Sequence, residues 1–266
     1  MHLAPTYIGW LANGEMPADL LRVRPFLTAE WRHLAMLNYR VAPALLAAYV
    51  PVGTELDAFA GVTYMSLVAF MFSNTRVLGI AIPGHRTFEE VNLRFYVCRR
   101  TPTGEWRRGV VFVKEIVPRR AIALVARAAY NEPYVALPMR HQIAGSPDGG
   151  VSAEYGWRTA RGWHVLAADA TGPAAPIEMG SKAEFITEHY WGYTAQRGGG
   201  TVEYRVTHPR WNLWDATTRL AGPRLDILYG PALGDVLASE PDSAFLADGS
   251  AVSIEMPNRL APAAAG

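Results

Sequence analysis

Apolar and polar side chains alternate strictly from Glu90 to Arg99, which predicts a strand. One face of this strand is wholly apolar and carries Val91, Leu93, Phe95 and Val97. The other face is mainly polar and carries Glu90, Asn92, Arg94 and Tyr96. If the apolar face packs against helices, the polar face points into the interior, where buried charges need water or a ligand. A solvent-facing strand, or a Glu90–Arg94 salt bridge that only fills the interior, would also explain the pattern.

Runs of β-branched and aromatic residues predict further strands on both sides of this one. They cover residues 34–41, 62–72, 110–116, 152–159, 163–168, 185–193, 202–208 and 252–256. Turn residues separate neighbouring strands, at 83–86, at Gly104 and at 198–200. We expect the first thirty residues to be irregular and the Ala/Pro-rich tail after Leu260 to be frayed.

Three helices are predicted, and each begins next to a proline. Pro43 suits the first turn of a short helix that Pro51 ends. Residues 119–130 carry apolar side chains at helical spacing, and this helix should stop before Pro133. A third, short helix is expected at residues 231–238.

Many strands with few helices predict the α+β class. We expect a mainly antiparallel β-barrel or a strongly curved sheet, with a few helices packed outside it. No repeat or long linker interrupts the pattern, so residues 1–266 are predicted to form a single domain with its core at about 25–257. Barrels of this kind commonly enclose or open onto a ligand cavity.

Composition narrows the range of partners. The 25 basic and 24 acidic side chains nearly cancel, which removes the electrostatic basis for binding nucleic acid or an anionic membrane. We therefore expect a small-molecule ligand as partner, and the sequence leaves a homo-oligomer open. The most apolar stretch, residues 60–72, is too short to span a bilayer, and the first residues lack the basic and apolar regions of a secretion signal, so we expect a chain that is neither membrane-inserted nor secreted.

Cysteine and histidine usage argues against metal and redox chemistry. Cys98 is the only cysteine, so neither an internal disulfide nor a thiolate zinc site can form, and a reducing, cytoplasmic location fits. The seven histidines show no HxH or HExxH spacing. We predict no metal site and no cofactor. His189 lies among aromatic and titratable residues, where it could close one end of a pocket or act as a hydrogen-bonded core histidine.

Three segments carry a family resemblance: FEEVNLRFYV, GVVFVKEIVPRRAIALVARAAYNEPY and ITEHYWGY. Together they resemble a family of uncharacterised YqjF-type proteins in the acetoacetate-decarboxylase-like superfamily, over roughly residues 25–257. The resemblance implies the barrel-like fold of that superfamily. It also implies that Glu90 matches the active-site glutamate of the decarboxylases.

The same resemblance places a tyrosine where the decarboxylases carry their Schiff-base lysine. Arg127, Tyr130 and Pro133 fit the motif around that lysine, but Tyr134 occupies its position and Val135 replaces its cationic neighbour. A phenol cannot form an imine, whereas acetoacetate decarboxylase requires a lysine amine for this step. Decarboxylation through a Schiff base is therefore not expected. Lys114 could be a Schiff-base lysine that has moved to another strand, or it could be a cation at the surface or at the rim of the barrel.

We predict a small-molecule-binding barrel that accepts a carboxylate or carbonyl compound. The candidate catalytic residues are Glu90 as base and Tyr134 as acid or hydrogen-bond donor, and the candidate ligand-binding residues are Asn92, Arg94, Arg127 and His189. One alternative is a lyase-type enzyme that performs acid–base chemistry on a keto acid. Another is a noncatalytic interaction protein whose barrel is filled by side chains, with Tyr134 a plain core aromatic. Whether the protein is an enzyme stays open.

Overall fold

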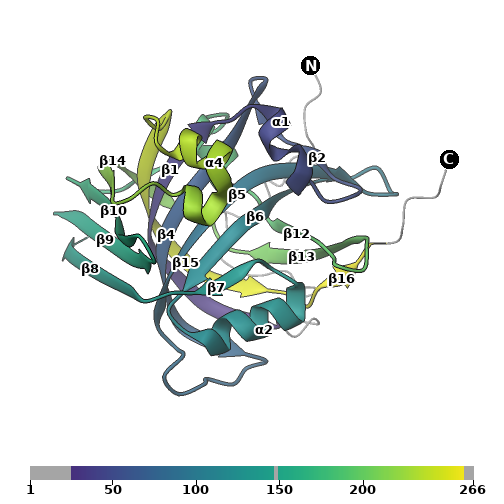
Figure 1. Cartoon of the computed structure of the whole chain (residues 1–266), viewed down its shortest axis with the longest axis horizontal. Coiled ribbons are helices and arrows are strands. Elements are labelled where there is room, and N and C mark those ends of the chain that lie inside the picture. The colour runs from purple at the N-terminus through teal and green to yellow at the C-terminus, as the bar shows by residue number, and fades with distance from the viewer. Residues whose placement is uncertain (1–24, 147–148, 261–266) are drawn as a thin grey trace.

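Long strands dominate the computed structural model, which describes residues 25–146 and 149–260 (Figure 1). The strands are β1 (Leu27–Arg40), β2 (Glu55–Leu56), β3 (Ala58–Phe59), β4 (Val62–Val77), β5 (Phe88–Arg100), β6 (Trp106–Val117), β7 (Tyr134–Ala136), β8 (Met139–Ser146), β9 (Gly150–Thr159), β10 (Gly162–Ala170), β11 (Ala175–Pro176), β12 (Trp191–Ala195), β13 (Thr201–Thr207), β14 (Asn212–Ala221), β15 (Ser243–Ile254) and β16 (Asn258–Arg259). The helices are α1 (Pro43–Leu46), the 3-10 turn η3 (Ala47–Tyr49), α2 (Arg120–Tyr130), α3 (Lys182–Thr187) and α4 (Asp226–Leu237).

The strands form one strongly curved, mixed sheet. Its central order is β13-β12-β6-β5-β4-β1-β15, and β15 pairs again with β13 through Val206↔Ile254 and Thr207↔Ser253. Most pairs are antiparallel, whereas β6 runs parallel to both β7 and β12. The predicted α+β class with a strongly curved sheet is confirmed. Among the described residues, no helix has the length and apolar character needed to cross a membrane.

Both faces of β5 are buried, but each faces a different part of the protein. The apolar face packs outward in a large hydrophobic cluster with side chains of α4 and of β9 and β10: Val91, Leu93, Phe95, Val97, Tyr155, Trp157, Leu166, Tyr229 and Leu233. The polar face points to the inside of the curve. Figure 1 shows β8, β9 and β10 projecting from one side of the sheet and α1 and α4 lying together above it.

Helix α2 forms as the sequence predicts, and the short strand after it was not predicted. The helix spans Arg120–Tyr130, within one residue of the predicted 119–130. It ends at Asn131, which adopts the left-handed conformation (φ 59°) that asparagine tolerates better than most residues. This turn redirects the chain into β7, which runs alongside β6.

Two predicted elements differ from the structure. Residues 185–193 were expected as one strand, but α3 occupies Lys182–Thr187 and β12 begins only at Trp191. A capping box starts this helix, because Ser181 Oγ accepts from the Glu184 amide while the Glu184 carboxylate accepts from the Gly180 amide. Strand β1 begins at Leu27, before the predicted start at residue 34, and residues 1–24, expected to be irregular, lie outside the described residues.

Positive φ angles explain other differences at element ends. His33 (φ 53°) lies at a bulge that breaks the apolar–polar alternation of β1 and hides its first half from pattern analysis. In α4, Gly230 (φ 79°) interrupts the helix, so the predicted helix from Pro231 is only the second half of the element. Strands β8 and β14 were not predicted. The tail after Leu260, expected to be frayed, lies outside the described residues.

Candidate functional site

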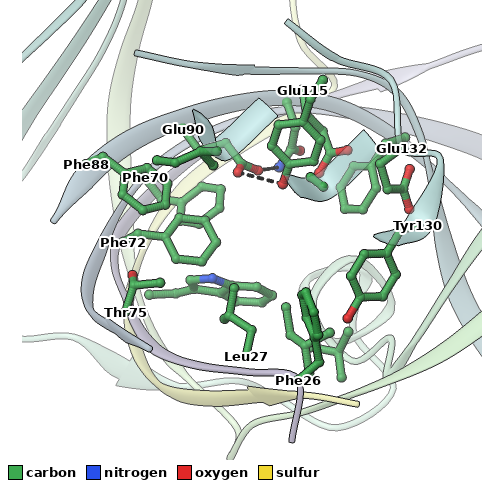
Figure 2. A pocket seen from close by; sticks show the side chains of 18 of the residues that line it. Phe26, Leu27, Phe70, Phe72, Thr75, Phe88, Glu90, Glu115, Tyr130 and Glu132 are labelled. Carbon is green, nitrogen blue, oxygen red and sulfur yellow. Dashed lines mark hydrogen bonds between the residues drawn. The ribbon is translucent and has the colours of Figure 1, made fainter. Parts of the chain in front are cut away.

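A cavity of about 190 Å³ lies inside the curve of the sheet. Strands β1, β4, β5 and β6 and helix α2 supply most of its wall. Figure 2 shows Glu90, Glu115 and Glu132 on one side of this cavity, with Phe70, Phe72, Phe88, Leu27 and Phe26 around the rest. The wall thus combines a carboxyl cluster with a broad aromatic surface. Glu90, Asn92, Arg94 and Tyr134, which the sequence analysis named as candidate site residues, all line this cavity.

Strand register brings the polar residues together. Asn92 of β5 pairs with Glu115 of β6, and Glu115 pairs in turn with Tyr134 of β7. Glu90 lies two residues before Asn92 on the same face of β5. The Tyr134 hydroxyl donates to Glu90 Oε2 at 3.0 Å, and Asn92 Nδ2 donates to Glu90 Oε1, also at 3.0 Å. The Glu90 carboxyl group is therefore held between two side chains from different strands.

Glu115 and Glu132 complete a cluster that the sequence analysis did not identify. Glu132 follows the end of α2, and its Oε1 accepts from the Tyr204 hydroxyl at 2.7 Å and from Thr194 Oγ1 at 2.5 Å. Lys114 and Glu115 lie on opposite faces of β6, so at most one of them can point inward, and Glu115 does. No comparable signal marked Glu132, because a left-handed turn at Asn131 sets its direction.

Burial raises the pKa values of all three carboxyl groups. Desolvation raises the pKa of Glu90 to about 7 and that of Glu132 to about 7. Desolvation, followed by the negative charges of Glu132 and Glu90, raises the pKa of Glu115 well above its ordinary range. Burial likewise raises the pKa of Tyr134 well above its ordinary value, so its phenol stays protonated. The cluster therefore retains protons near neutral pH that exposed carboxyl groups release.

Arg94 forms the cationic part of the cavity wall. Arg94 is only 8% exposed, and its contacts are weak. Its Nη2 lies 3.9 Å from Met36 Sδ, and its guanidinium lies 6.0 Å from the centre of the Tyr96 ring. Its Nε has no hydrogen-bond partner among the described residues. Among the described residues, Arg94 is the only lysine or arginine that lines the cavity. Its positive charge lowers the pKa of Glu90, which opposes the effect of burial.

Two histidines near Arg94 are held neutral by burial. Desolvation lowers the pKa of His189 to about 4 and that of His208 to about 4. His189 lines the cavity, with its ring 4.6 Å from the Tyr96 ring and Nε2 3.4 Å from Asp57 Oδ2. Arg94 therefore carries the fixed positive charge at this end of the cavity.

Unpaired buried polar atoms concentrate in this wall. Several cavity residues have a buried side-chain atom without a hydrogen-bond partner among the described residues: Trp31 Nε1, Thr75 Oγ1, Asn92 Oδ1, Arg94 Nε, Glu115 Oε2 and Glu132 Oε2. Buried polar atoms of folded proteins are usually satisfied. Most of the unpaired buried polar atoms of the described residues thus belong to this one wall.

Arg127 and the two lysines lie apart from this cluster. Arg127 does not line the cavity, and its Nε donates at 2.7 Å to the backbone carbonyl of Tyr134, which anchors β7. Lys114 points to the other face of β6, where its amine donates to the Leu228 carbonyl of α4. Lys182 pairs with Asp242. Within the described ranges, no group of three His, Cys, Asp or Glu side chains is arranged to hold a metal ion.

Sequence comparison finds related chains of the same length class. The profile of the family DUF2071, described as an uncharacterized conserved protein, matches residues 28–251. The uncharacterized protein YqjF of Bacillus subtilis is 29% identical over 192 residues, which cover 72% of this chain and 76% of YqjF.

Solved structures of acetoacetate-decarboxylase-like proteins share the fold. Acetoacetate decarboxylase from Legionella pneumophila aligns with a TM-score of 0.62 at 12% identity, covering 89% of this chain and 87% of that enzyme. The enduracididine biosynthesis enzyme MppR, complexed with pyruvate, aligns with a TM-score of 0.61 at 12% identity, covering 90% and 92%. An acetoacetate-decarboxylase-like enzyme from Sphingomonas wittichii gives 0.58 at 15% identity, covering 90% and 94%. At these identities the similarity concerns the fold alone.

Proposed function

Because this chain belongs to the DUF2071 family and has an acetoacetate-decarboxylase-like fold, we propose that its cavity binds a small carboxylate that also carries a carbonyl group. Arg94 holds the ligand carboxylate, and the carbonyl group lies toward Glu90 and Tyr134. The observation that carries this proposal is the state of Arg94, a buried guanidinium whose Nε is unpaired, whose Nη2 contacts a sulfur atom, and which forms no ion pair among the described residues.

A buried arginine without an anionic partner is energetically unfavourable. Removing one partner of a buried ion pair typically destabilises a protein by about 3–5 kcal/mol, because the remaining charge loses its hydration. A ligand carboxylate would relieve this cost through two parallel charge-assisted hydrogen bonds to the planar guanidinium. The complex of MppR with pyruvate supports the same ligand chemistry for this fold, as an analogy.

The carboxyl cluster favours proton transfer as a second candidate function. A group whose pKa lies near the working pH serves best as a general acid or base, and burial raises the pKa of Glu90 to about 7. Glu90 would remove a proton from the carbon beside the ligand carbonyl, the C–H electron pair would form the C=C bond of an enolate, and the π pair of the carbonyl would move to its oxygen. The high pKa of Tyr134 suits hydrogen-bond donation to that oxygen rather than release of its own proton. Enolisation, hydration or dehydration of a keto acid would follow this route.

The proposed chemistry does not use a Schiff base. Tyr134 stands where the resemblance places the reactive lysine, and Lys114 and Lys182 make contacts away from the cavity. Borohydride added together with acetoacetate should therefore leave no substrate carbon on the protein, as judged by mass spectrometry. A stable adduct on Lys114 would instead support decarboxylation through a Schiff base.

An open cavity supports ligand binding over the alternative of a filled barrel. The space of about 190 Å³ corresponds to roughly six water molecules of liquid volume. If side chains filled the interior, as the noncatalytic alternative requires, no space of this volume would remain beside three buried carboxyl groups.

Calorimetric titration with pyruvate tests the binding proposal. The natural chain should bind pyruvate, and Arg94→Leu should abolish binding, whereas Arg94→Lys should weaken it because an ammonium group lacks the planar fork. Pyruvamide, which lacks the carboxylate, should bind poorly to all three proteins. Arg158→Leu, at an exposed position of β9, is the matched control and should bind like the natural chain. Equal binding by Arg94→Leu and the control would overturn the proposal.

A further inference from the structure

The cavity wall beside Glu90 and across from Glu132 is aromatic (Figure 2). Trp31, Phe70, Phe72 and Phe88 line it together, from strands β1, β4 and β5. Phe72 and Phe88 stack with their ring centres 4.7 Å apart, and Trp31 meets Phe70 edge-on at 5.5 Å. Figure 2 shows Phe70, Phe72 and Phe88 across the cavity from Glu132. These rings fix one another in place, so the surface they offer is rigid.

The apolar surface continues to the mouth of the cavity. Ile80 and Ile82, in the segment between β4 and β5, and Val125 of α2 belong to the wall and remain exposed, by 67%, 42% and 42%. An apolar route therefore leads from solvent past the aromatic rings to the polar groups. Exposed apolar side chains of this kind gain stability when a ligand covers them.

A three-carbon acid would leave this aromatic surface unused. Apart from its methyl group, pyruvate consists of a carbonyl and a carboxylate, and its polar contacts would be made with Arg94, Glu90 and Tyr134. The remaining volume limits what else the ligand carries. Apolar cavities of about 150 Å³ bind one benzene molecule, so a cavity of about 190 Å³ has room for one aromatic ring.

We propose that the ligand of this cavity is a carboxylate with a single aromatic ring, of the arylpyruvate type, whose ring packs against Trp31, Phe72 and Phe88. This inference rests on the proposed function, because it takes from it the carboxylate at Arg94. The 2-oxo group then lies between the ring and the carboxylate, next to Glu90 and Tyr134. Trp31, Phe72 and Phe88 determine specificity and take no part in proton transfer.

Four ligands distinguish binding of the aromatic ring, which is inferred here, from binding of the carboxylate, which belongs to the proposed function. Calorimetric titration would compare phenylpyruvate, pyruvate, 3-phenylpropanoate and phenylacetone on the natural chain. We expect phenylpyruvate to bind at least about tenfold more tightly than pyruvate, because its ring leaves water on binding. Phenylacetone, which lacks the carboxylate, should bind more weakly than phenylpyruvate, whereas 3-phenylpropanoate should bind measurably because it keeps both the ring and the carboxylate.

Substitution of one aromatic side chain tests the location of the ring. Phe72→Ala should reduce the preference for phenylpyruvate over pyruvate and leave pyruvate binding unchanged, and Phe72→Leu serves if the alanine variant does not fold. Phe59→Ala removes a partly buried ring of β3 outside the cavity and should keep the preference. Equal affinity for phenylpyruvate and pyruvate, with both lost in Arg94→Leu, would overturn this inference while the proposed function stands. Absence of binding by all four ligands would remove the proposed function itself, and the inference with it.

Discussion

Tyr134 donates a hydrogen bond of 3.0 Å to Glu90 Oε2, although 44 residues separate the two along the chain. The bond stabilises the charged form of the carboxylate and lowers the pKa of Glu90, whereas burial raises it to about 7. Asn92, Tyr134 and Arg94 thus all lower the pKa of this buried glutamate against the effect of burial. Tyr134 owes its position to the pairing of β7 with β6, since the Glu115↔Tyr134 register places its side chain beside the cluster.

Replacing Tyr134 by phenylalanine should raise the pKa of Glu90 above about 7. The variant keeps the ring and removes only the donor, so desolvation acts on the carboxyl group with less opposition. An NMR titration of 13C-labelled glutamate side chains measures the change. Tyr49→Phe, at an exposed tyrosine, is the control and should leave the titration as it is. An unchanged or lower pKa in Tyr134→Phe would contradict the hydrogen bond.

Replacing Glu90 by glutamine should change how stability depends on pH. The folded chain holds the Glu90 proton up to about pH 7, whereas the unfolded chain releases it near pH 4.5, so the native protein loses stability as pH rises through this window. Glutamine has no such proton. The variant should therefore gain stability relative to the natural chain between about pH 5 and 8, by up to ~3 kcal/mol. Urea unfolding across this range measures the difference.

The control for this pH experiment is Glu178→Gln, an exposed glutamate outside the cavity. Its stability difference from the natural chain should be independent of pH over the same range. A Glu90→Gln difference that is also flat with pH would mean that Glu90 ionises with an ordinary pKa in the folded state.

The sequence predicted the part of the site that lies on one strand. Alternation along β5 gave the shared face of Glu90, Asn92 and Arg94, and β-strand geometry alone fixes that face. The family resemblance added Tyr134. In contrast, Glu132 is oriented by the left-handed turn at Asn131 and by donors on β12 and β13, so its place depends on pairings that no local pattern encodes.

The same distinction explains the errors in secondary structure. The alternation of β1 is broken by its bulge at His33, and α3 is short and follows a capping box that an aromatic, strand-like composition outweighed. Arg127 fitted the family motif, yet α2 turns its guanidinium toward the Tyr134 carbonyl and away from the cavity. Sequence spacing gave the helix but not the direction of this long side chain.

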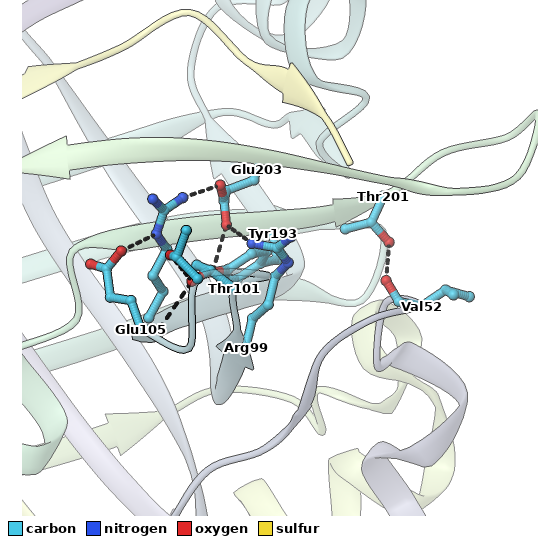
Figure 3. A network of polar contacts seen from close by, with 9 residues as sticks. Val52, Arg99, Thr101, Glu105, Tyr193, Thr201 and Glu203 are labelled. Atoms are coloured by element: carbon cyan, nitrogen blue, oxygen red, sulfur yellow. Dashed lines mark hydrogen bonds and ion pairs between the residues drawn. The ribbon is translucent and has the colours of Figure 1, made fainter. Parts of the chain in front are cut away.

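Replacing Glu203 by glutamine should destabilise the chain by about 2–3 kcal/mol, the scale of hydrogen bonds to charged groups. Glu203 accepts from Arg107, from Arg99 at 3.2 Å and from the Tyr193 hydroxyl at 2.9 Å, and only 6% of its side chain is exposed (Figure 3). The neutral amide removes the charge that holds both arginines against β13. Thermal and urea unfolding measure the loss.

Glu105→Gln is the matched control for this change. Glu105 binds the same Arg107, at 3.3 Å, but 45% of its side chain is exposed, so water screens the pair. Its loss should amount to less than about 1 kcal/mol. Similar losses for Glu203→Gln and Glu105→Gln would show that burial of the network contributes nothing to its strength.

Replacing Gly192 by alanine should disturb the carboxyl cluster from a distance. A Cβ atom at Gly192 would lie 2.1 Å from Cζ and 2.4 Å from the hydroxyl oxygen of Tyr204, so the ring must move. Tyr204 then loses its 2.7 Å hydrogen bond to Glu132, a bond that lowers the pKa of this glutamate. We expect a stability loss of about 1–3 kcal/mol, typical of overpacking, together with a Glu132 pKa above about 7 in the glutamate NMR titration.

Gly198→Ala tests whether the close approach of Tyr204 causes these effects. Gly198 lies in the turn between β12 and β13, and a Cβ atom there would have no other atom within 4 Å. Both variants add the same methyl group, so any general effect of replacing glycine on the unfolded chain is shared. If Gly192→Ala lost no more stability than Gly198→Ala and left the titration of Glu132 unchanged, Tyr204 could not be packed against Gly192 as the structure has it. If only Gly192→Ala lost stability and raised the pKa of Glu132, the packing of β12 against Tyr204 would control how tightly Glu132 holds its proton.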